Sequence, residues 1–303
     1  MKHLFYLWLL IFLSCNLFSQ QSGTFSQYIF NRGIINPAYP GTKACTEFFF
    51  TDRHQLVGFG GAPSLQTLSA YHSFSAKKLS KSGIGMNLLN DMNGAYKTLA
   101  GEAMYAFHFL ISRKHNLMMG FGLSGIIRQE ILDEHNFSPI PDPIVSGGVE
   151  RQLMGNAATG VEIYNDHFFI SAAAYNLIPG ITQREQRAYL FHAGYNVGSP
   201  KKKFKFQPSV FFESNRRMNI SDLTQKFIYK EKYWLGLQFR KYLTGYARSS
   251  QNLTVFVGID MNAWIIGYAF ELGINQLQSH HFGGHLLTIG YQLCKERFSC
   301  PAY

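Results

Sequence analysis

The feature that most constrains the fold is an alternation of large apolar residues with small or polar ones in many short segments. From Trp264 to Leu272 every second side chain is large and apolar, and the residues between them include Gly267 and Glu271. Successive side chains of a β-strand point to opposite faces. One face of large apolar and aromatic side chains beside one face of small or polar side chains is typical of strands in a transmembrane barrel. The alternation therefore predicts strands with one lipid face and one lumen face.

The alternation also assigns a face to individual side chains. Along residues 188–197 the large residues again share one side. The side chains expected to face lipid are Tyr189, Phe191, Tyr195, Trp264, Ile266, Tyr268 and Phe270. Met104, Phe211 and Phe256 are expected to face the lumen. Glu102, Arg240 and Glu271 are expected there as well, because a barrel lumen tolerates charge.

Placing every alternating segment predicts about fourteen strands, an even number, as in bacterial single-chain barrels. They are expected at 43–51, 66–75, 83–90, 97–109, 116–127, 156–164, 167–176, 187–197, 204–213, 222–229, 233–240, 252–259, 264–272 and 284–294. No later apolar run reaches the ~18 residues that a transmembrane helix needs, and no linker divides the chain. The predicted fold class is all-β, a transmembrane antiparallel up-and-down β-barrel formed by residues 43–303.

The lengths of the connections favour the same topology. In a barrel with periplasmic termini, every second connection is a short periplasmic turn and the others are longer extracellular loops. The expected turns are 76–82, 111–115, 165–166, 198–203, 230–232 and 260–263, and the expected loops include 128–155, 177–186, 241–251 and 273–283. Only one outer connection, near 91–96, is expected to be short.

Composition agrees with a barrel in a membrane. Aromatic residues make up 16% of the chain and charged residues only 15%, which argues against a soluble β-sandwich with polar outer faces. Much of the positive charge behind the formal net charge of +10 falls in expected turns, for example at Lys201–Lys203. These charges form either a solvated rim or a surface for an acidic periplasmic partner. No nucleic-acid partner is expected, since no recognition motif or stacking platform accompanies these charges.

The first residues have the pattern of a secretory signal. A basic start precedes the short apolar run Leu4–Leu13, which is too short to span a bilayer as a helix. We expect residues 1–20 to be removed, and residues 21–42 to form an N-terminal periplasmic segment ahead of the barrel. The rival is lipoprotein processing at Cys15, but Phe12 stands where leucine is usual. After cleavage the chain is expected in the outer membrane, which it would cross many times.

The stretch from Thr24 to Thr67 carries a more specific pattern. Asn36-Pro37 sets one turn, because the residue before a proline is disfavoured in the helical region, and Pro40-Gly41 closes a second turn. A glycine-rich connection then joins two strand-like segments. The residues of the pattern are Phe25, Ser26, Gln27, Tyr28, Asn31, Asn36, Pro37, Ala38, Tyr39, Gly41, Arg53, Gln55, Gly58, Phe59, Gly61, Ala62, Pro63 and Gln66.

In this order, these residues resemble the motif of the PorP/SprF family, outer-membrane proteins of the type IX secretion system of Bacteroidota. The family pattern reads roughly F-S-Q-Y-x-F-N, then N-P-A-Y-x-G, then R-x-Q-W-V-G-F-x-G-A-P-x-x-Q. The chain departs from it at Leu56, where tryptophan is usual, and at Pro40, where alanine is common. The rest of the chain fits the family by strand pattern and length.

The resemblance implies a non-enzymatic component of type IX secretion. Some family members contact the periplasmic ring and motor proteins of the machinery. Others assist the export or surface anchoring of one secreted, adhesin-type partner, through the C-terminal domain of that partner. For this chain we expect residues 25–41 to close or brace the periplasmic end of the barrel.

A partner is expected to dock on the outer loops and the barrel mouth. The longest expected loop carries the candidate partner-binding residues Phe137, Pro139, Pro141 and Pro143. The alternative function is an outer-membrane channel or transporter for small solutes, which would need a polar and open lumen. The bulky side chains expected on the inward face argue against it.

No catalytic site, metal site or cofactor is expected. The 11 histidines include no pair at zincin spacing and no cysteine–histidine cluster. His280, His281 and His285 lie near an outer loop, where solvated histidines are commoner than a metal site. Asp52 and His54 could suggest a hydrolase, but they lie inside the motif without a nucleophile elbow or a pair of acids.

Barrel closure brings the first and last strands together, because closure removes the sheet edges. Cys45 lies near the periplasmic start of the first expected strand and Cys294 near the periplasmic end of the last, both in the lumen phase. A disulfide between them is expected to persist in the oxidising periplasm. The alternatives are a bond from Cys300 to one of them, or three unpaired thiols.

Overall fold

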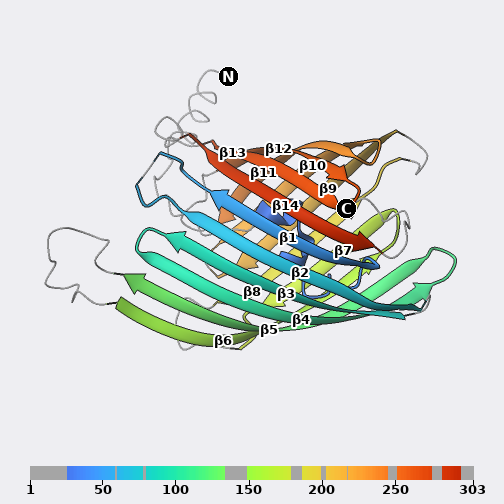
Figure 1. Ribbon diagram of the computed structural model, residues 1–303, viewed down its shortest axis with the longest axis horizontal. Coiled ribbons are helices and arrows are strands. Elements are labelled where there is room, and N and C mark those ends of the chain that lie inside the picture. The colour runs from blue at the N-terminus through green and yellow to red at the C-terminus, as the bar shows by residue number, and fades with distance from the viewer. Residues whose placement is uncertain are drawn as a thin grey trace, which may run out of the picture.

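The computed structural model describes residues 26–58, 60–77, 80–133, 149–178, 186–198, 203–216, 218–244, 251–274 and 282–294. These ranges form a closed antiparallel barrel of fourteen strands, in which sequence neighbours pair and β1 pairs with β14 (Figure 1). The strands are β1 (Cys45–His54), β2 (Ser64–Lys77), β3 (Ser80–Asn93), β4 (Tyr96–Ser112), β5 (Leu117–Asp133), β6 (Val149–Tyr164), β7 (Phe168–Tyr175), β8 (Ala188–Tyr195), β9 (Phe204–Asn215), β10 (Asn219–Tyr229), β11 (Tyr233–Thr244), β12 (Gln251–Met261), β13 (Trp264–Gly273) and β14 (Gly284–Cys294). The predicted fold class is confirmed, and each predicted strand overlaps an observed one. Across the described part of the chain, no helix is long and apolar enough to cross a membrane.

The two ends of the barrel differ in their connections. The end at which β1 begins and β14 finishes, on the right in Figure 1, carries short turns such as Lys230–Lys232. We call it the turn end, and the opposite end the loop end. Lys230, Glu231 and Asn262 adopt positive φ angles of 52°, 57° and 59°, as tight hairpin turns require. In outer-membrane barrels the short turns are periplasmic and the longer loops extracellular.

Two connections at the loop end are shorter than the sequence predicts. β5 continues to Asp133 and β6 begins at Val149, so both strands extend into the expected loop 128–155, where they stay paired. Residues 216–218 alone join β9 to β10. The expectation of a single short outer connection, near 91–96, is therefore wrong. Ladder hydrogen bonds hold paired strands together beyond the apolar band, where the alternation of side chains no longer marks them.

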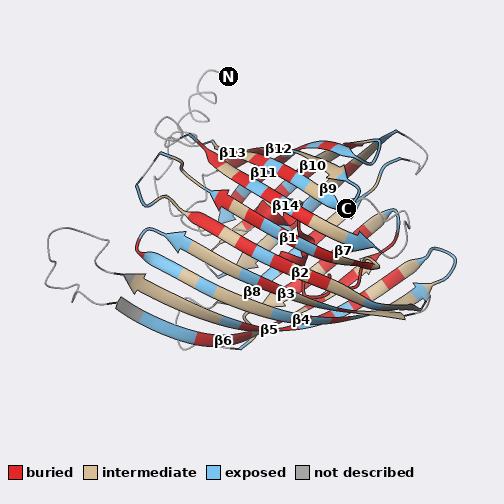
Figure 2. Cartoon of the chain, viewed as in Figure 1, coloured by how far each residue is buried: buried red, intermediate tan, exposed pale blue. Residues whose placement is uncertain are grey.

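Side chains alternate between the two faces of the wall, as the sequence predicts (Figure 2). Phe270 alone of the expected lipid-facing residues is partly covered, by the ring of His285 at a centroid distance of 5.2 Å. The others are exposed on the outer surface: Tyr189, Phe191, Tyr195, Trp264, Ile266 and Tyr268. Met104, Phe211 and Phe256 are buried inside the barrel.

The hydrophobic core lies in the lumen. Buried clusters form around Tyr28 and Ile35, around Tyr39, and around Trp234 and Phe256. Each cluster contains or contacts residues of the segment that precedes β1. The inside of the barrel is therefore packed by the chain itself.

Candidate functional site

The segment Ser26–Thr42, here called the lumen segment, lies inside the barrel ahead of β1 and is blue in Figure 1. It contains two short 3₁₀ helices, η1 (Ser26–Ile29) and η2 (Arg32–Ile34). All of its residues are buried except Ile29 and Phe30, which are half-buried. The sequence predicts a segment at the periplasmic end of the barrel. The structure places these residues within the lumen instead, because their polar side chains find partners along the inner wall.

The lumen segment runs from the loop end toward the turn end. Near its start, the side chain of Gln27 accepts a hydrogen bond of 2.9 Å from the hydroxyl of Thr67, near the loop end of β2. At the other extremity, the Pro40 carbonyl accepts a hydrogen bond from Nε2 of His108, near the turn end of β4, at 2.8 Å. The segment thus crosses much of the length of the barrel before the chain enters β1.

Side-chain turns fix the local shape of the segment. The Asn31 side chain caps η2 by accepting a hydrogen bond from the Gly33 amide at 3.1 Å, and Asn36 Oδ1 accepts from the Ala38 amide at 2.9 Å. Short polar side chains that bond to the backbone two residues on favour turns over helix or strand. Gly41 has φ of +92°, a left-handed conformation that glycine adopts without strain. The motif residues therefore specify a compact coil.

A polar cluster anchors the segment in the loop-end half of the barrel. Asp222 accepts two hydrogen bonds of 2.7 Å from Arg240 and one of 2.8 Å from the Tyr28 hydroxyl. Gln238 donates to the Tyr28 oxygen at 2.7 Å. The Tyr28 ring also stacks on Phe211, with ring centroids 4.5 Å apart. Burial and the neighbouring Asp222 raise the pKa of Tyr28 well above its usual value, so its hydroxyl keeps the proton that it donates.

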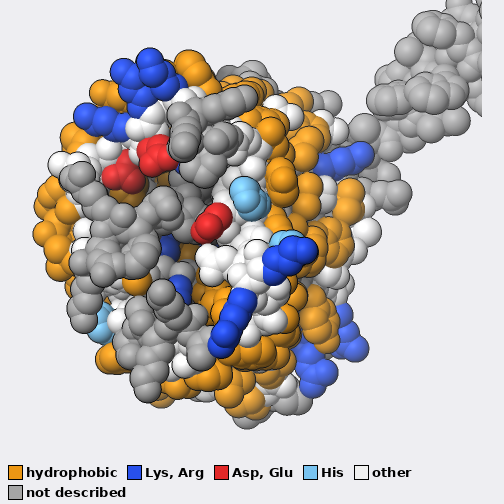
Figure 3. Space-filling view, turned by 90° about the vertical axis from the view of Figure 1, so that its right-hand side faces the viewer, with side chains coloured by type: hydrophobic (Ala, Val, Ile, Leu, Met, Phe, Trp, Pro, Cys, Tyr) orange, Lys and Arg blue, Asp and Glu red, His pale blue; other side chains and the backbone are white. Residues whose placement is uncertain are grey.

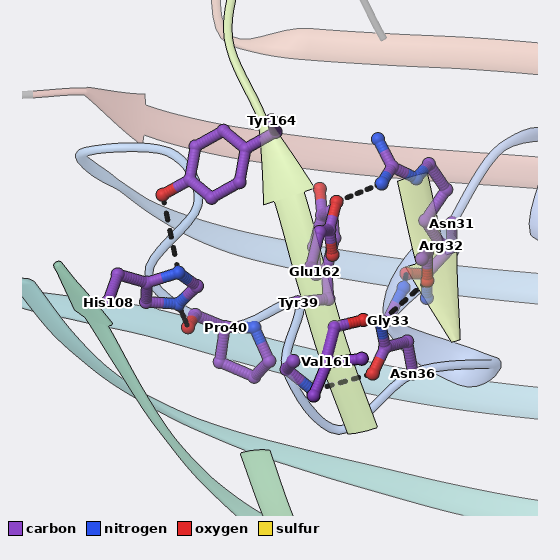
Figure 4. Close-up of polar contacts among 12 residues, drawn as sticks. Asn31, Arg32, Gly33, Asn36, Tyr39, Pro40, His108, Val161, Glu162 and Tyr164 are labelled. Atoms are coloured by element: carbon purple, nitrogen blue, oxygen red, sulfur yellow. Dashed lines mark hydrogen bonds and ion pairs between the residues drawn. The ribbon is translucent and has the colours of Figure 1, made fainter. Parts of the chain in front are cut away.

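A second set of contacts holds the middle of the segment (Figure 4). Arg32 forms a buried ion pair with Glu162 on β6, and its guanidinium lies 3.6 Å from the centroid of the Phe169 ring. The Asn36 amide donates to the Val161 carbonyl at 3.1 Å and to the Ser171 hydroxyl at 2.6 Å. The segment is therefore tied to β6 and β7 as well as to β10 and β11.

Glycines in the wall leave room for the backbone of the segment. A Cβ on Gly83 would collide with the carbonyl group of Pro40, and a Cβ on Gly122 with that of Pro37. Close approach of one backbone to another is a common reason for glycine inside a strand. The wall and the segment are therefore shaped for each other.

The second half of the motif meets the first half inside the barrel. Arg53, on β1, forms a buried ion pair of 2.7 Å with Glu271 on β13. Thr67, on β2, donates to the side chain of Gln27 at 2.9 Å.

The other motif residues of the second half shape the β1–β2 connection. The Gln55 amide donates to the Pro63 carbonyl at 2.9 Å, and Gly58 and Gly61 have φ of +109° and +71°. Gln66 donates to Asp52 at 2.9 Å. Ala62 lies in the same connection, whereas Phe25 and Phe59 lie outside the described residues.

Sequence reasoning missed the wall partners of the lumen segment. The alternation places Glu162, Asp222 and His108 on the lumen face of their strands, where charged and titratable side chains are tolerated, so it gives no reason to expect that they bind the segment. One sequence signal could have identified a wall partner. Asp222 and Arg240 carry opposite charges on adjacent strands, and they are direct neighbours in the β10–β11 register. The alternation predicts that Arg240 faces the lumen but does not identify Asp222 as its partner.

The other residues considered from the sequence lie elsewhere in the barrel. Cys45 and Cys294 are cross-strand neighbours in the β1–β14 pairing, with Cα atoms 4.1 Å apart, and form a disulfide. Asp52 and His54 pair at 3.0 Å on the surface. His285 hydrogen-bonds with the Tyr268 hydroxyl at 2.6 Å. Among the described residues, no group of three or more histidine, cysteine or acidic side chains gathers as metal ligands would.

Several predicted sites lie outside the described residues. They are the signal sequence 1–20, Cys15, Cys300, His280, His281 and the loop residues Phe137, Pro139, Pro141 and Pro143.

Comparisons with known proteins agree with the barrel. A family model described as type IX secretion system membrane protein PorP/SprF matches residues 17–291. No curated protein matches the chain. The CymD monoaromatic hydrocarbon channel is similar in structure, with a TM-score of 0.56 and 9% identity over 89% of this chain and 94% of that one. The Ralstonia pickettii toluene transporter TbuX gives 0.50 and 10%, covering 86% and 92%, and Acinetobacter baumannii Omp33 gives 0.50 and 8%, covering 84% and 99%. At these identities the likeness shows the fold alone.

Proposed function

Because the chain belongs to the PorP/SprF family of type IX secretion system membrane proteins, we propose that it serves secretion as a non-enzymatic barrel that binds a secreted partner at its loop end. The C-terminal domain of an adhesin-type protein docks there. The barrel assists the export of that protein, or holds it at the cell surface. The outer-membrane type of the fold and the family both favour the outer membrane as the site of this role.

The observation that carries the proposal is the occupied lumen. The lumen segment makes polar contacts with β2 through Asn31, with β6 through Arg32 and with β10 through Tyr28. These strands lie on different sides of the barrel. A diffusion channel requires an open, polar path, whereas a packed interior gives a rigid platform for its loops. The filled barrel therefore supports a binding role over a pore.

Both ends offer surfaces to partners. The connection 134–148, which carries the candidate residues Phe137 to Pro143, is the longest between strands and would contact the secreted protein at the loop end. At the turn end, lysine and arginine side chains surround the mouth (Figure 3). Exposed examples are Lys114, Lys203, Lys230 and Lys232. A periplasmic ring or motor protein with an acidic surface would match this charge.

The alternative function, a channel or transporter for small solutes, requires the lumen segment to leave the barrel. Planar-bilayer recording separates the two functions. We expect no steady conductance from the intact protein, and open-channel conductance once Ser26–Thr42 is deleted, because the deletion removes the packing of the lumen. Steady conductance by the intact protein would favour the channel.

Affinity purification from detergent-solubilised outer membranes tests the proposal itself. A tag at the turn end of the intact chain leaves the loop end free. Recovery of a secreted protein with its C-terminal domain is the expected result. Recovery of periplasmic ring proteins alone would assign the protein to the core machinery, and recovery of neither class would overturn the secretion role.

A further inference from the structure

A small cavity lies inside the barrel between the lumen segment and the inner wall of β7 to β10. Its volume is about 30 Å³, which is room for one or two particles of the size of a water molecule. Its polar and charged lining includes Arg32 from the lumen segment and His192, Ser209, Thr224 and Lys226 from the wall. Phe169 and Phe256 supply apolar parts of the lining.

The lining of the cavity is cationic. Arg32 and Lys226 both border it, and none of the described residues that line it is acidic. Arg32 is neutralised in part by Glu162. The Lys226 ammonium lies 4.6 Å from the centroid of the Trp234 ring and forms no ion pair with a carboxylate of the described residues. Asp260 attracts the Lys226 ammonium without forming an ion pair, and the like charge of Lys43 opposes that attraction, so the positive charge of Lys226 is compensated only in part. A buried charge that is incompletely compensated is costly, so the cavity favours a negative occupant.

Hydrogen-bond donors line the same space. Ser209 and Thr224 contribute hydroxyl groups. The Nδ1 atom of His192, a residue that is 4% exposed, has no hydrogen-bond partner among the described residues. A ring with its proton on Nδ1 would donate from there. Buried polar atoms without a partner commonly mark a bound water or ion.

We propose that this cavity binds a small monovalent anion of the size of chloride, held between Arg32 and Lys226. The anion completes the compensation that Asp260 gives to Lys226 only in part, and it bridges the lumen segment to β10. Water alone would leave the charge of Lys226 only partly balanced. A phosphate or sulfate carries four oxygens, which exceed the space. The inference concerns how the segment is held in the lumen and stands apart from the proposed role in secretion.

Thermal unfolding of the full chain in detergent tests the site. The wild-type protein is expected to melt at higher temperature in sodium chloride than in sodium gluconate of equal ionic strength, with an effect that saturates. Lys226→Met, or Thr224→Val if the first variant does not fold, should raise the chloride concentration for half of the effect on the order of tenfold, the loss expected for a hydrogen bond to a charged group. Lys230→Met, on the turn outside the cavity, is the control and should match the wild type.

Bromide replaces chloride in the crystallographic arm of the same experiment. An anomalous peak between Arg32 and Lys226 in bromide-soaked crystals of the wild type is the expected result. The proposal is overturned if the cavity shows no such peak, or if chloride raises the melting temperature of Lys226→Met or Thr224→Val as it does that of the control.

Discussion

Asp222 and Arg240 face each other on β10 and β11 and are almost completely buried in the lumen. A buried ion pair is weak evidence of net stability, but the removal of one partner leaves a charge without compensation. Tyr28 joins this pair through its hydroxyl. Single residues on the wall therefore decide whether the lumen segment stays in place.

Asp222→Asn should destabilise the folded barrel by about 3–5 kcal/mol, because Arg240 is left as an unpaired buried charge. Tyr28→Phe removes the two hydrogen bonds of the hydroxyl, to Asp222 and from Gln238, but keeps the ring, so its cost should be about 1–3 kcal/mol. Urea unfolding in lipid vesicles measures both. Equal costs for the two variants would contradict the central role of the ion pair.

Two adjacent residues on β13 test the faces of the wall. Ile266 faces lipid, and Ile266→Arg should cost about 2–4 kcal/mol near the middle of the membrane. From alternation alone, Gly267→Ser would be mild. The structure contradicts that expectation, since a Cβ at Gly267 would lie 2.7 Å from the Phe30 ring and 2.8 Å from the Trp234 ring.

Both substitutions should therefore destabilise the barrel in a heat-modifiability gel. Gly267→Ser should also loosen the lumen segment and speed its proteolysis, whereas Ile266→Arg should not. Rapid proteolysis of that segment in Ile266→Arg would argue against the assigned faces.

At the scale of elements, β1 and β14 form the seam that closes the barrel. The seam is held by strand pairing over the length of β1 and by the disulfide at the turn end. Non-reducing peptide mapping of the mature protein should yield the Cys45 and Cys294 peptides joined to each other. A bond from Cys45 to Cys300, or Cys45 found only as a free thiol, would contradict the disulfide between β1 and β14.

The longest connection at the loop end gives a second prediction for an element. Trimming Phe137–Val145 should weaken the export or surface attachment of the secreted partner, because loops on a rigid scaffold commonly carry the binding site. Barrel assembly, read by heat modifiability, should be unchanged. Shortening the 176–187 connection by the same number of residues is the matched control. Full attachment of the partner to the trimmed protein would exclude this loop as the docking site.

At the scale of the whole molecule, the direction of the lumen segment has a topological consequence. The segment advances from Gln27, which is bonded to Thr67 near the loop end of β2, to Pro40 near the turn end. Between Ser26 and the turn end, the lumen is filled by the segment itself. An epitope attached ahead of Ser26 is therefore predicted to be accessible from the loop end.

An epitope tag inserted ahead of Ser26, after the signal sequence, tests this direction. The tag should bind antibody on intact cells, as should a control tag in the 134–148 connection. A tag in the Lys230–Lys232 turn should bind only after the outer membrane is permeabilised. If the first tag behaved like the turn tag, the segment would enter from the periplasmic side.

Much of the architecture was determined by the sequence alone. Alternation along β13 and β8 assigned the lipid and lumen faces, because the period of a strand leaves each side chain only two directions. An even number of strands with alternating short and long connections then specified an up-and-down barrel. The family followed from the ordered motif between Phe25 and Gln66. All of these are local or periodic properties, which a linear chain displays directly.

Only the tertiary structure decided what the motif does. The turns at Asn36 and Gly41 predicted an irregular segment, but its place in the lumen depends on Glu162, Asp222 and His108, which lie on distant strands. No local pattern links these residues, since barrel closure alone brings them around one segment. The sequence likewise does not explain why Gly83 and Gly122 stand in the wall. A missing side chain at these positions matters only because the backbone of the lumen segment occupies its space.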